Sequence, residues 1–138
     1  MKKIITLFVF ALILNVSCNS AKQNSSEPYI QLTKKRCFGK CPVYDLFIYR
    51  DGLVKYNGID HVSKKGRHQF KISKDKLVEI ESLLLNSGLE SLKDPEKRTR
   101  DLPVTHLSFQ HKTVLFQGND MPEKIKKVIK AIESLVVI

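Results

Sequence analysis

The residues best suited to chemistry are two cysteines, Cys37 and Cys41, with Gly39 between them and Pro42 directly after. In an extended strand, Cα atoms four residues apart are about 13 Å from each other, whereas a disulfide needs roughly 4.4–6.8 Å. A bond therefore requires residues 38–40 to turn back, which Gly39 allows because it adopts positive φ angles at no steric cost. Closing such a loop would stabilise the fold by about 2 kcal/mol.

Three states of this cysteine pair fit the sequence: a structural disulfide, which we favour, a redox-active or metal-binding thiol pair, and a reduced, inert pair. The basic triplet 34–36 before Cys37 would favour the thiolate if the cysteines were free. A metal site would need further ligands, such as His106 or His61. The histidines, however, have no metal-type spacing from the cysteines or from one another; they are His61, His68, His106 and His111.

The N-terminus resembles a bacterial lipoprotein signal. Two lysines are followed by an apolar run, residues 4–14, that is too short to span a bilayer, and small residues precede Cys18. We predict a signal peptide over residues 1–17, a lipid on Cys18 and a polar tether over residues 18–27. The alternative is an ordinary cleaved signal peptide that releases a soluble periplasmic protein.

The cysteine count and the charge extend this prediction. A lipid on Cys18 leaves two of the three cysteines as a pair, which an exported location would keep oxidised. Because no acidic run follows Cys18, we expect a cell-envelope protein on the periplasmic face of the outer membrane. The net charge of +10 attracts anions. The expected partners are the membrane, through the N-terminal lipid, and an unknown protein or anionic envelope component, but not nucleic acid; a solvated basic surface is the simpler explanation of the charge.

Residues 28–138 suit one domain with one core. Asp51-Gly52 is typical of a two-residue hairpin, Ser73 can cap a helix, and Gly88 can end it. Alternating apolar residues predict strands at 29–33, 53–58, 67–72, 105–109 and 113–117, and the strand from residue 53 can continue to residue 63 past a bulge at Gly58. Residues 43–50 are apolar in both strand phases and predict a central strand. Apolar stripes predict helices over 74–87 and from Pro122 towards residue 136.

The order β-β-β-β-α-β-β-α, with hairpins rather than crossovers, predicts an α+β domain: an antiparallel sheet of five or six strands with two helices on one face. The opposite sheet face is then the natural binding surface. The last helix has lysines beside its apolar stripe and could lie on a membrane, but we expect it to close the core.

Two motifs carry a resemblance to a known family. Cys-Phe-Gly-x-Cys-Pro-x-Tyr followed by Asp-Gly-x-Val-x-Tyr-x-Gly resembles a family of small bacterial exported domains, the domain of unknown function DUF6438. The matching residues are Cys37, Phe38, Gly39, Cys41, Pro42, Tyr44, Asp51, Gly52, Val54, Tyr56 and Gly58. The similarity covers about residues 29–136, with Asp101-Leu102-Pro103 and Pro122 as later matches. It implies a fold but no established activity.

A weaker similarity is the Cys-x-x-x-Cys-Pro spacing of thioredoxin-like copper chaperones. That family places the motif between a strand and a helix, whereas Cys37 and Cys41 precede a hairpin.

Catalysis finds little support in the sequence, which has no nucleophile elbow, zinc-protease helix motif or phosphate-binding loop, and we expect no cofactor. Arg98 and Arg100 with Asp101 could bind an anion, but we favour a solvated loop.

The leading hypothesis is a non-enzymatic, lipid-anchored envelope domain that binds a protein or an anionic component. The alternative is a thiol-redox or copper- or zinc-binding protein that uses Cys37 and Cys41.

Overall fold

A computed structural model describes residues 27–118 and 120–136, so the predicted signal peptide and Cys18 lie outside the described residues. Over these described residues there are six strands and two α-helices in the predicted order, with a short 3-10 helix, η2, after α2. The elements are β1 (Ile30–Lys34), β2 (Val43–Ile48), β3 (Leu53–Asp60), β4 (Gly66–Lys71), α2 (Lys74–Leu85), η2 (Leu89–Ser91), β5 (Val104–Phe109), β6 (Lys112–Gln117) and α3 (Glu123–Glu133).

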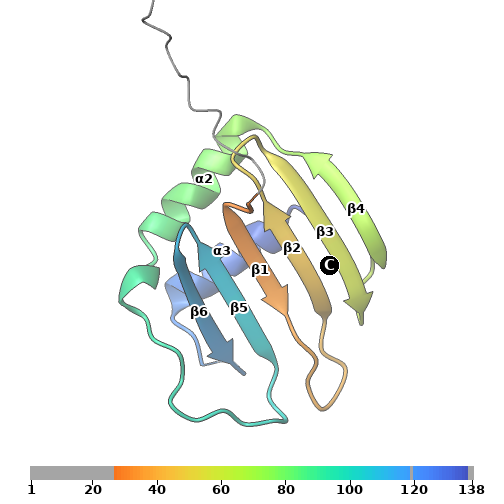
Figure 1. Cartoon of the computed structure of the whole chain (residues 1–138), viewed down its shortest axis with the longest axis vertical. Coiled ribbons are helices and arrows are strands. Elements are labelled where there is room, and N and C mark those ends of the chain that lie inside the picture. Colours follow the sequence, from red (N-terminus) through yellow and green to blue (C-terminus); the bar gives the residue numbers. More distant parts are fainter. Residues whose placement is uncertain (1–26, 119, 137–138) are drawn as a thin grey trace, which may run out of the picture.

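The six strands make one antiparallel sheet in the order β4-β3-β2-β1-β5-β6. Both helices, α2 and α3, lie on the same side, behind the sheet in Figure 1, and no other helix of the described residues covers the opposite face. The predicted fold class is therefore confirmed. Within the described residues, no helix is long and apolar enough to cross a bilayer.

The core fills the space between the sheet and the two helices. Alternate side chains on each strand enter it, which is why β2 buries Leu46 and Ile48 while Phe47 between them lies on the open face. From α3 the core receives Ile125, Val128, Ile129 and Ile132, so this helix closes the core, as predicted.

Local sequence explains where the helices begin and end. The Ser73 hydroxyl accepts a hydrogen bond from the Lys76 amide at 3.2 Å and caps α2, as predicted. The helix ends at Leu85, two residues earlier than predicted, because Gly88 adopts a left-handed φ of 79° and starts η2. Glu123 opens α3 after Pro122, where an acidic side chain faces the positive end of the helix dipole.

The bulge predicted at Gly58 falls one residue later. Val43 pairs with Asp60 and Tyr44 with Gly58, so Ile59 is the extra residue on β3. The strand ends at Asp60 and does not run on to residue 63.

Both sheet edges are protected against pairing with another chain. The edge strand β4 exposes the polar side chains Arg67, His68 and Gln69. The opposite edge strand, β6, is covered by the loop that precedes β5. There the Leu115 amide donates to the Asp94 carboxylate, and the Gln117 side chain pairs with the backbone of Thr99, all at 2.9 Å.

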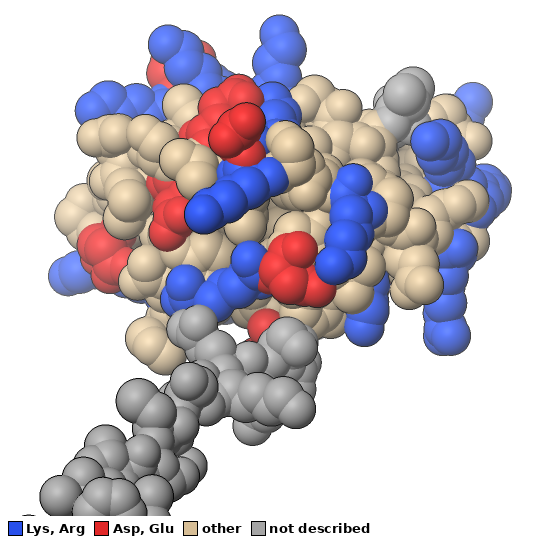
Figure 2. Space-filling model, turned by 90° about the horizontal axis from the view of Figure 1, so that it is seen from above, with Lys and Arg blue, Asp and Glu red and all other residues tan. Residues whose placement is uncertain are grey.

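Positive and negative side chains alternate over the end of the molecule where β2 turns into β3, as Figure 2 shows. Lys71 Nζ lies 3.4 Å from the Asp51 carboxylate there, and Lys76 Nζ lies 2.9 Å from Glu79. This end is a mixed, solvated surface and not a field of one sign.

Candidate functional site

The two motif cysteines form a disulfide, with their Cα atoms 5.9 Å apart. Gly39 adopts a φ of 154°, which other residues rarely take, so it provides the predicted turn. Backbone bonds hold the loop against the start of β5: the Lys35 amide donates to Val104 at 2.8 Å and the Phe38 amide to Asp101 at 3.3 Å. The loop is thus a rigid projection at one end of the sheet, at the bottom of Figure 1.

The structure does not bring histidines to this disulfide. In the described part of the chain, no group of three or more His, Cys, Asp or Glu side chains could hold a metal ion. The His61 ring lies 3.5 Å from the Asp60 carboxylate, and the His68 ring is bonded to the Lys65 carbonyl at 3.0 Å. His106 lies on the open sheet face, where its own burial, then Lys35 and then Arg98 lower its pKa.

Tyr44 of the first motif connects the sheet to α3. Its ring is fully buried and its hydroxyl donates a hydrogen bond to Glu133, which also pairs with Lys34 Nζ at 2.5 Å. Burial, followed by the charge of Glu133, raises the pKa of Tyr44 far above its usual value. This group joins the two strands beside the disulfide loop to the end of the last helix.

Tyr56 and Gly58 of the second motif are linked by packing. The Tyr56 ring lies 5.8 Å from that of Tyr44, and its buried hydroxyl has no hydrogen-bond partner among the described residues. A Cβ on Gly58 would lie 1.9 Å from the Lys64 carbonyl and 2.9 Å from the Tyr56 hydroxyl. Only glycine lets the β3–β4 turn close over this ring.

Asp51 and Gly52 make the hairpin between β2 and β3. The Asp51 carboxylate accepts the Leu53 amide at 3.1 Å, and Gly52 has a φ of 79°. A Cβ on Gly52 would lie 2.8 Å from the Ile72 carbonyl. Val54, the next motif residue, is fully buried. These motif positions therefore serve the fold.

Phe38 differs from the other large motif side chains, because 89% of its surface is exposed. It lies at the tip of the disulfide loop, between Arg36 and Lys40, which are also exposed. The Phe38 ring is not part of the core, so packing within this fold does not explain why position 38 carries an aromatic side chain.

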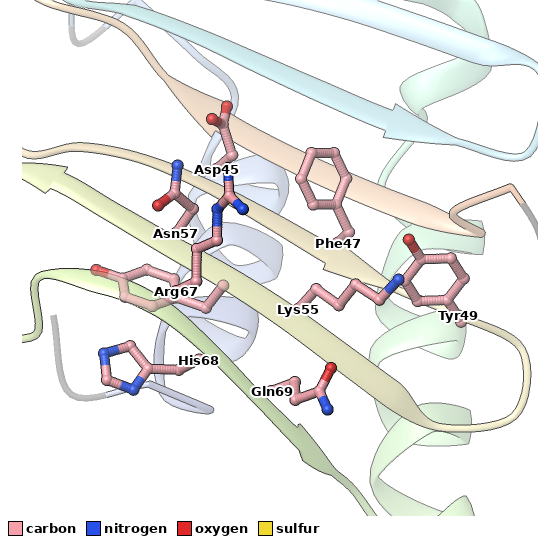
Figure 3. Close-up of a pocket in the computed structure, with 9 residues that line it drawn as sticks. Asp45, Phe47, Tyr49, Lys55, Asn57, Arg67, His68 and Gln69 are labelled. Carbon is pink, nitrogen blue, oxygen red and sulfur yellow. The ribbon is translucent and has the colours of Figure 1, made fainter.

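The open sheet face has a hollow of about 480 Å³ over β2, β3 and β4 (Figure 3). Phe47 lies in the middle of this face, and the Arg67 side chain extends from β4 towards Asp45 and Asn57. We call it the open-face hollow; its lining residues are Asp45, Phe47, Tyr49, Lys55, Tyr56, Asn57, Arg67, His68 and Gln69.

Contacts between neighbouring strands order several of these side chains. Asp45 accepts a hydrogen bond from the Thr33 hydroxyl of β1 at 2.9 Å. Lys55 Nζ lies 4.9 Å from the centre of the Tyr49 ring, within the range of a cation–π contact. The hollow therefore combines apolar rings with cations and amides, the mixture typical of ligand sites.

The sequence contains a signal for the open-face hollow: residues 43–50 are apolar in both strand phases. That pattern correctly indicates an inner strand. Phe47 and Tyr49 form the second phase, on the face without helices, and their polar neighbours come from β3 and β4. The second apolar phase indicates the aromatic part of the hollow, but the family motifs do not, because the polar side chains are brought there by strand order.

The expected solvated loop is present after η2. Residues 96–101 are all exposed, and Arg98 lies 3.6 Å from the Asp94 carboxylate. This ion pair draws the Arg98 side chain to Asp94 instead of Asp101.

Taken together, the protein is an α+β domain with a six-stranded antiparallel sheet, two helices on one face and a disulfide-closed loop at one end. The family model for the domain of unknown function DUF6438 matches residues 28–136, so the chain belongs to this family. No curated protein matches the chain.

Proposed function

We propose that this chain is a non-enzymatic, lipid-anchored binding domain of the cell envelope, and that its ligand occupies the open-face hollow. The observation that carries the proposal is the hollow itself: two aromatic side chains, Phe47 and Tyr49, lie among cations and amides on the sheet face that no helix covers. The lipoprotein-like signal ending at Cys18 supports the location, on the periplasmic face of the outer membrane.

The polar groups of the hollow favour an anionic ligand. Arg67 and Lys55 supply positive charge, and Asn57 and Gln69 supply amide donors. The one carboxylate, on Asp45, already accepts a bond from Thr33. Because a guanidinium matches a carboxylate with two parallel bonds, the best-fitting ligand is a carboxylate-bearing envelope polymer such as peptidoglycan.

Sedimentation with purified peptidoglycan sacculi tests the ligand. We expect Arg67→Gln and Phe47→Ala each to weaken binding about tenfold, since a charge-assisted bond or a buried ring contributes about 1.5 kcal/mol. Lys112→Gln, which removes a cation from the opposite edge strand, should leave binding unchanged. Equal binding by all variants, or none by the original chain, would refute the ligand.

Intact mass of the chain from native membranes tests the anchor. We expect a lipid adduct on Cys18 and a disulfide between Cys37 and Cys41. A Cys18→Ser chain should move from the membrane to the soluble fraction while its open face still binds sacculi. A mature protein that is wholly soluble and without lipid would overturn the anchoring.

A further inference from the structure

We propose that the sheet end carrying the disulfide loop docks on an anionic phospholipid surface, with the Phe38 ring inserted between the lipid head groups. This surface, which we call the loop end, comprises the disulfide loop, the end of β3 with the turn to β4, and residues 101–103 directly before β5. It is distinct from the open-face hollow and adds a second contact with the membrane.

Exposed apolar side chains are concentrated at the loop end. The described residues include five large apolar side chains that are exposed, and three of them, Phe38 (89%), Ile59 (42%) and Leu102 (41%), lie in the segments that make up this end. Hydrogen bonding brings two of these segments together, because the Phe38 amide donates to the carbonyl of Asp101, next to Leu102. Ile59 is the bulged residue opposite Val43, which directly follows the loop.

Cations surround this apolar tip. The loop carries Lys35, Arg36 and Lys40, all exposed. Asp60 connects the loop to the next turn, since its carboxylate lies 3.3 Å from Arg36 and 3.7 Å from Lys65. An exposed aromatic ring with cations on both sides of it along the loop fits an anionic bilayer, where the cations meet phosphates and the aromatic ring lies at head-group depth.

Rigidity suits the loop to insertion. The disulfide and the two backbone bonds to the start of β5 fix the loop before any membrane is met, so little ordering entropy is lost on docking. A protein partner would also accept an exposed ring, but the excess of cations around it favours a surface of repeated negative charge.

The lipid anchor and the loop end can reach the same bilayer. The first described residues and the disulfide loop lie at opposite ends of β1 in Figure 1. The nine residues 19–27 span about 30 Å when extended, whereas the five residues of β1 cover about 17 Å. This step rests on the proposed lipid on Cys18, so the test uses a chain that cannot be lipidated.

The probe is a single tryptophan, because the chain has none. Phe38→Trp is introduced into the chain from residue 18 onward with Cys18→Ser, which keeps every described residue, and vesicles of phosphatidylglycerol and phosphatidylcholine are added. We expect a blue shift of the tryptophan emission that is absent with phosphatidylcholine alone and that weakens as salt is added. Val78→Trp, an exposed position on α2, serves as the matched control and should not shift.

Vesicle sedimentation of the same chain measures the contribution of each group. Phe38→Ala should weaken the partition about tenfold, and Lys35→Gln or Lys40→Gln about fivefold each. Val78→Ala should change nothing. Equal binding to neutral vesicles, unchanged binding of Phe38→Ala, or no emission shift would overturn the proposal, whatever the result with sacculi.

Discussion

At the scale of single residues, the two motifs divide into side chains that the fold needs and one that it does not. Tyr44 bonds to Glu133 on the last helix, and Gly58 admits the β3–β4 turn above Tyr56. Phe38 is exposed. A recurrent sequence pattern can thus contain structural positions and a surface position side by side, and only burial separates them.

Gly58 and Gly66 allow two effects of an added Cβ on stability to be separated: a steric clash at Gly58 and an unfavourable backbone φ at Gly66. In Gly58→Ala the new Cβ meets the Lys64 carbonyl at 1.9 Å, so we expect a loss of more than about 3 kcal/mol in the free energy of unfolding. In Gly66→Ala nothing lies within 4 Å, but the φ of 85° remains, so the loss should be about 1 kcal/mol. Urea denaturation of both variants measures the difference. Similar losses would contradict the close approach at Gly58.

Alkaline pH should destabilise the protein through its tyrosines. Burial is the largest cause that raises the pKa of Tyr29, Tyr44 and Tyr56 above 10.0. Above pH 10 the unfolded chain releases these protons and the folded chain keeps them. The stability they contribute is therefore complete below pH 10 and is lost as the pH rises, by up to about 1.4 kcal/mol per unit for Tyr44.

The Tyr44→Phe variant provides the check on this titration. It removes one of these protons, so its stability should fall less steeply between pH 9 and 11 in denaturation curves. Val78→Ala, at an exposed position on α2 that carries no titrating group, should follow the original slope. If Tyr44→Phe and the original chain have the same pH dependence, the buried hydroxyl does not hold its proton as described.

At the scale of elements, the disulfide loop and the end of α3 both hold the start of β2. The loop leads into β2, and Glu133 near the end of α3 bonds to Tyr44 at the start of that strand. The two elements are far apart in sequence but stabilise the same strand. A destabilising change in either one should therefore lower the free energy of unfolding of the whole domain.

Removing the disulfide should lower stability without abolishing the fold. Cys37→Ser with Cys41→Ser should reduce the free energy of unfolding by about 2 kcal/mol, because a short closed loop restricts the unfolded chain. A reducing agent should cause the same loss in the original chain and none in the double variant. Binding to sacculi should be retained. Loss of binding in a folded double variant would instead favour a thiol function.

A pair of valines tests whether α3 closes the core. Val128 on α3 has no exposed surface, so Val128→Ala should cost about 2 kcal/mol. Val78 on α2 is 52% exposed, and Val78→Ala should cost less than about 0.5 kcal/mol. Thermal unfolding compares the two. An equal, small effect would mean that α3 does not pack on the sheet in solution.

At the scale of the whole molecule, one cluster of buried side chains joins the sheet to both helices. The helices occupy one face of the sheet and the open-face hollow lies on the other. The loop end projects from one end of the strands. This separation would allow the proposed polymer ligand and the proposed membrane surface to be bound at the same time.

A single core predicts a single unfolding transition. Far-ultraviolet circular dichroism and tyrosine fluorescence should give the same midpoint and the same slope with denaturant, since no element buries its apolar side without the others. Two resolved transitions would contradict the single cluster, and they would mean that α2 or the β5–β6 hairpin unfolds independently.

The local elements and the fold class could be predicted from patterns along the chain. The period of two in the strands, the Ser73 cap, the Asp51-Gly52 turn and the apolar stripe of α3 depend on neighbours along the chain, so each could be predicted from its own segment. The position of the bulge was missed by one residue, because it depends on how β3 pairs with β2. The end of α2 was missed by two residues, because Asn86 caps the helix ahead of the left-handed Gly88.

Which side chains meet could not be predicted in this way, because it depends on how the strands and helices pack. Strand order brings Arg67 of β4 and Phe47 of β2 into one hollow, and packing against α3 gives Tyr44 its carboxylate partner 89 residues away. Exposure is also a property of the folded chain: periodicity gave no reason to treat Phe38 differently from Tyr44. A binding surface is made by segments distant in sequence, and their contacts arise only when the sheet forms.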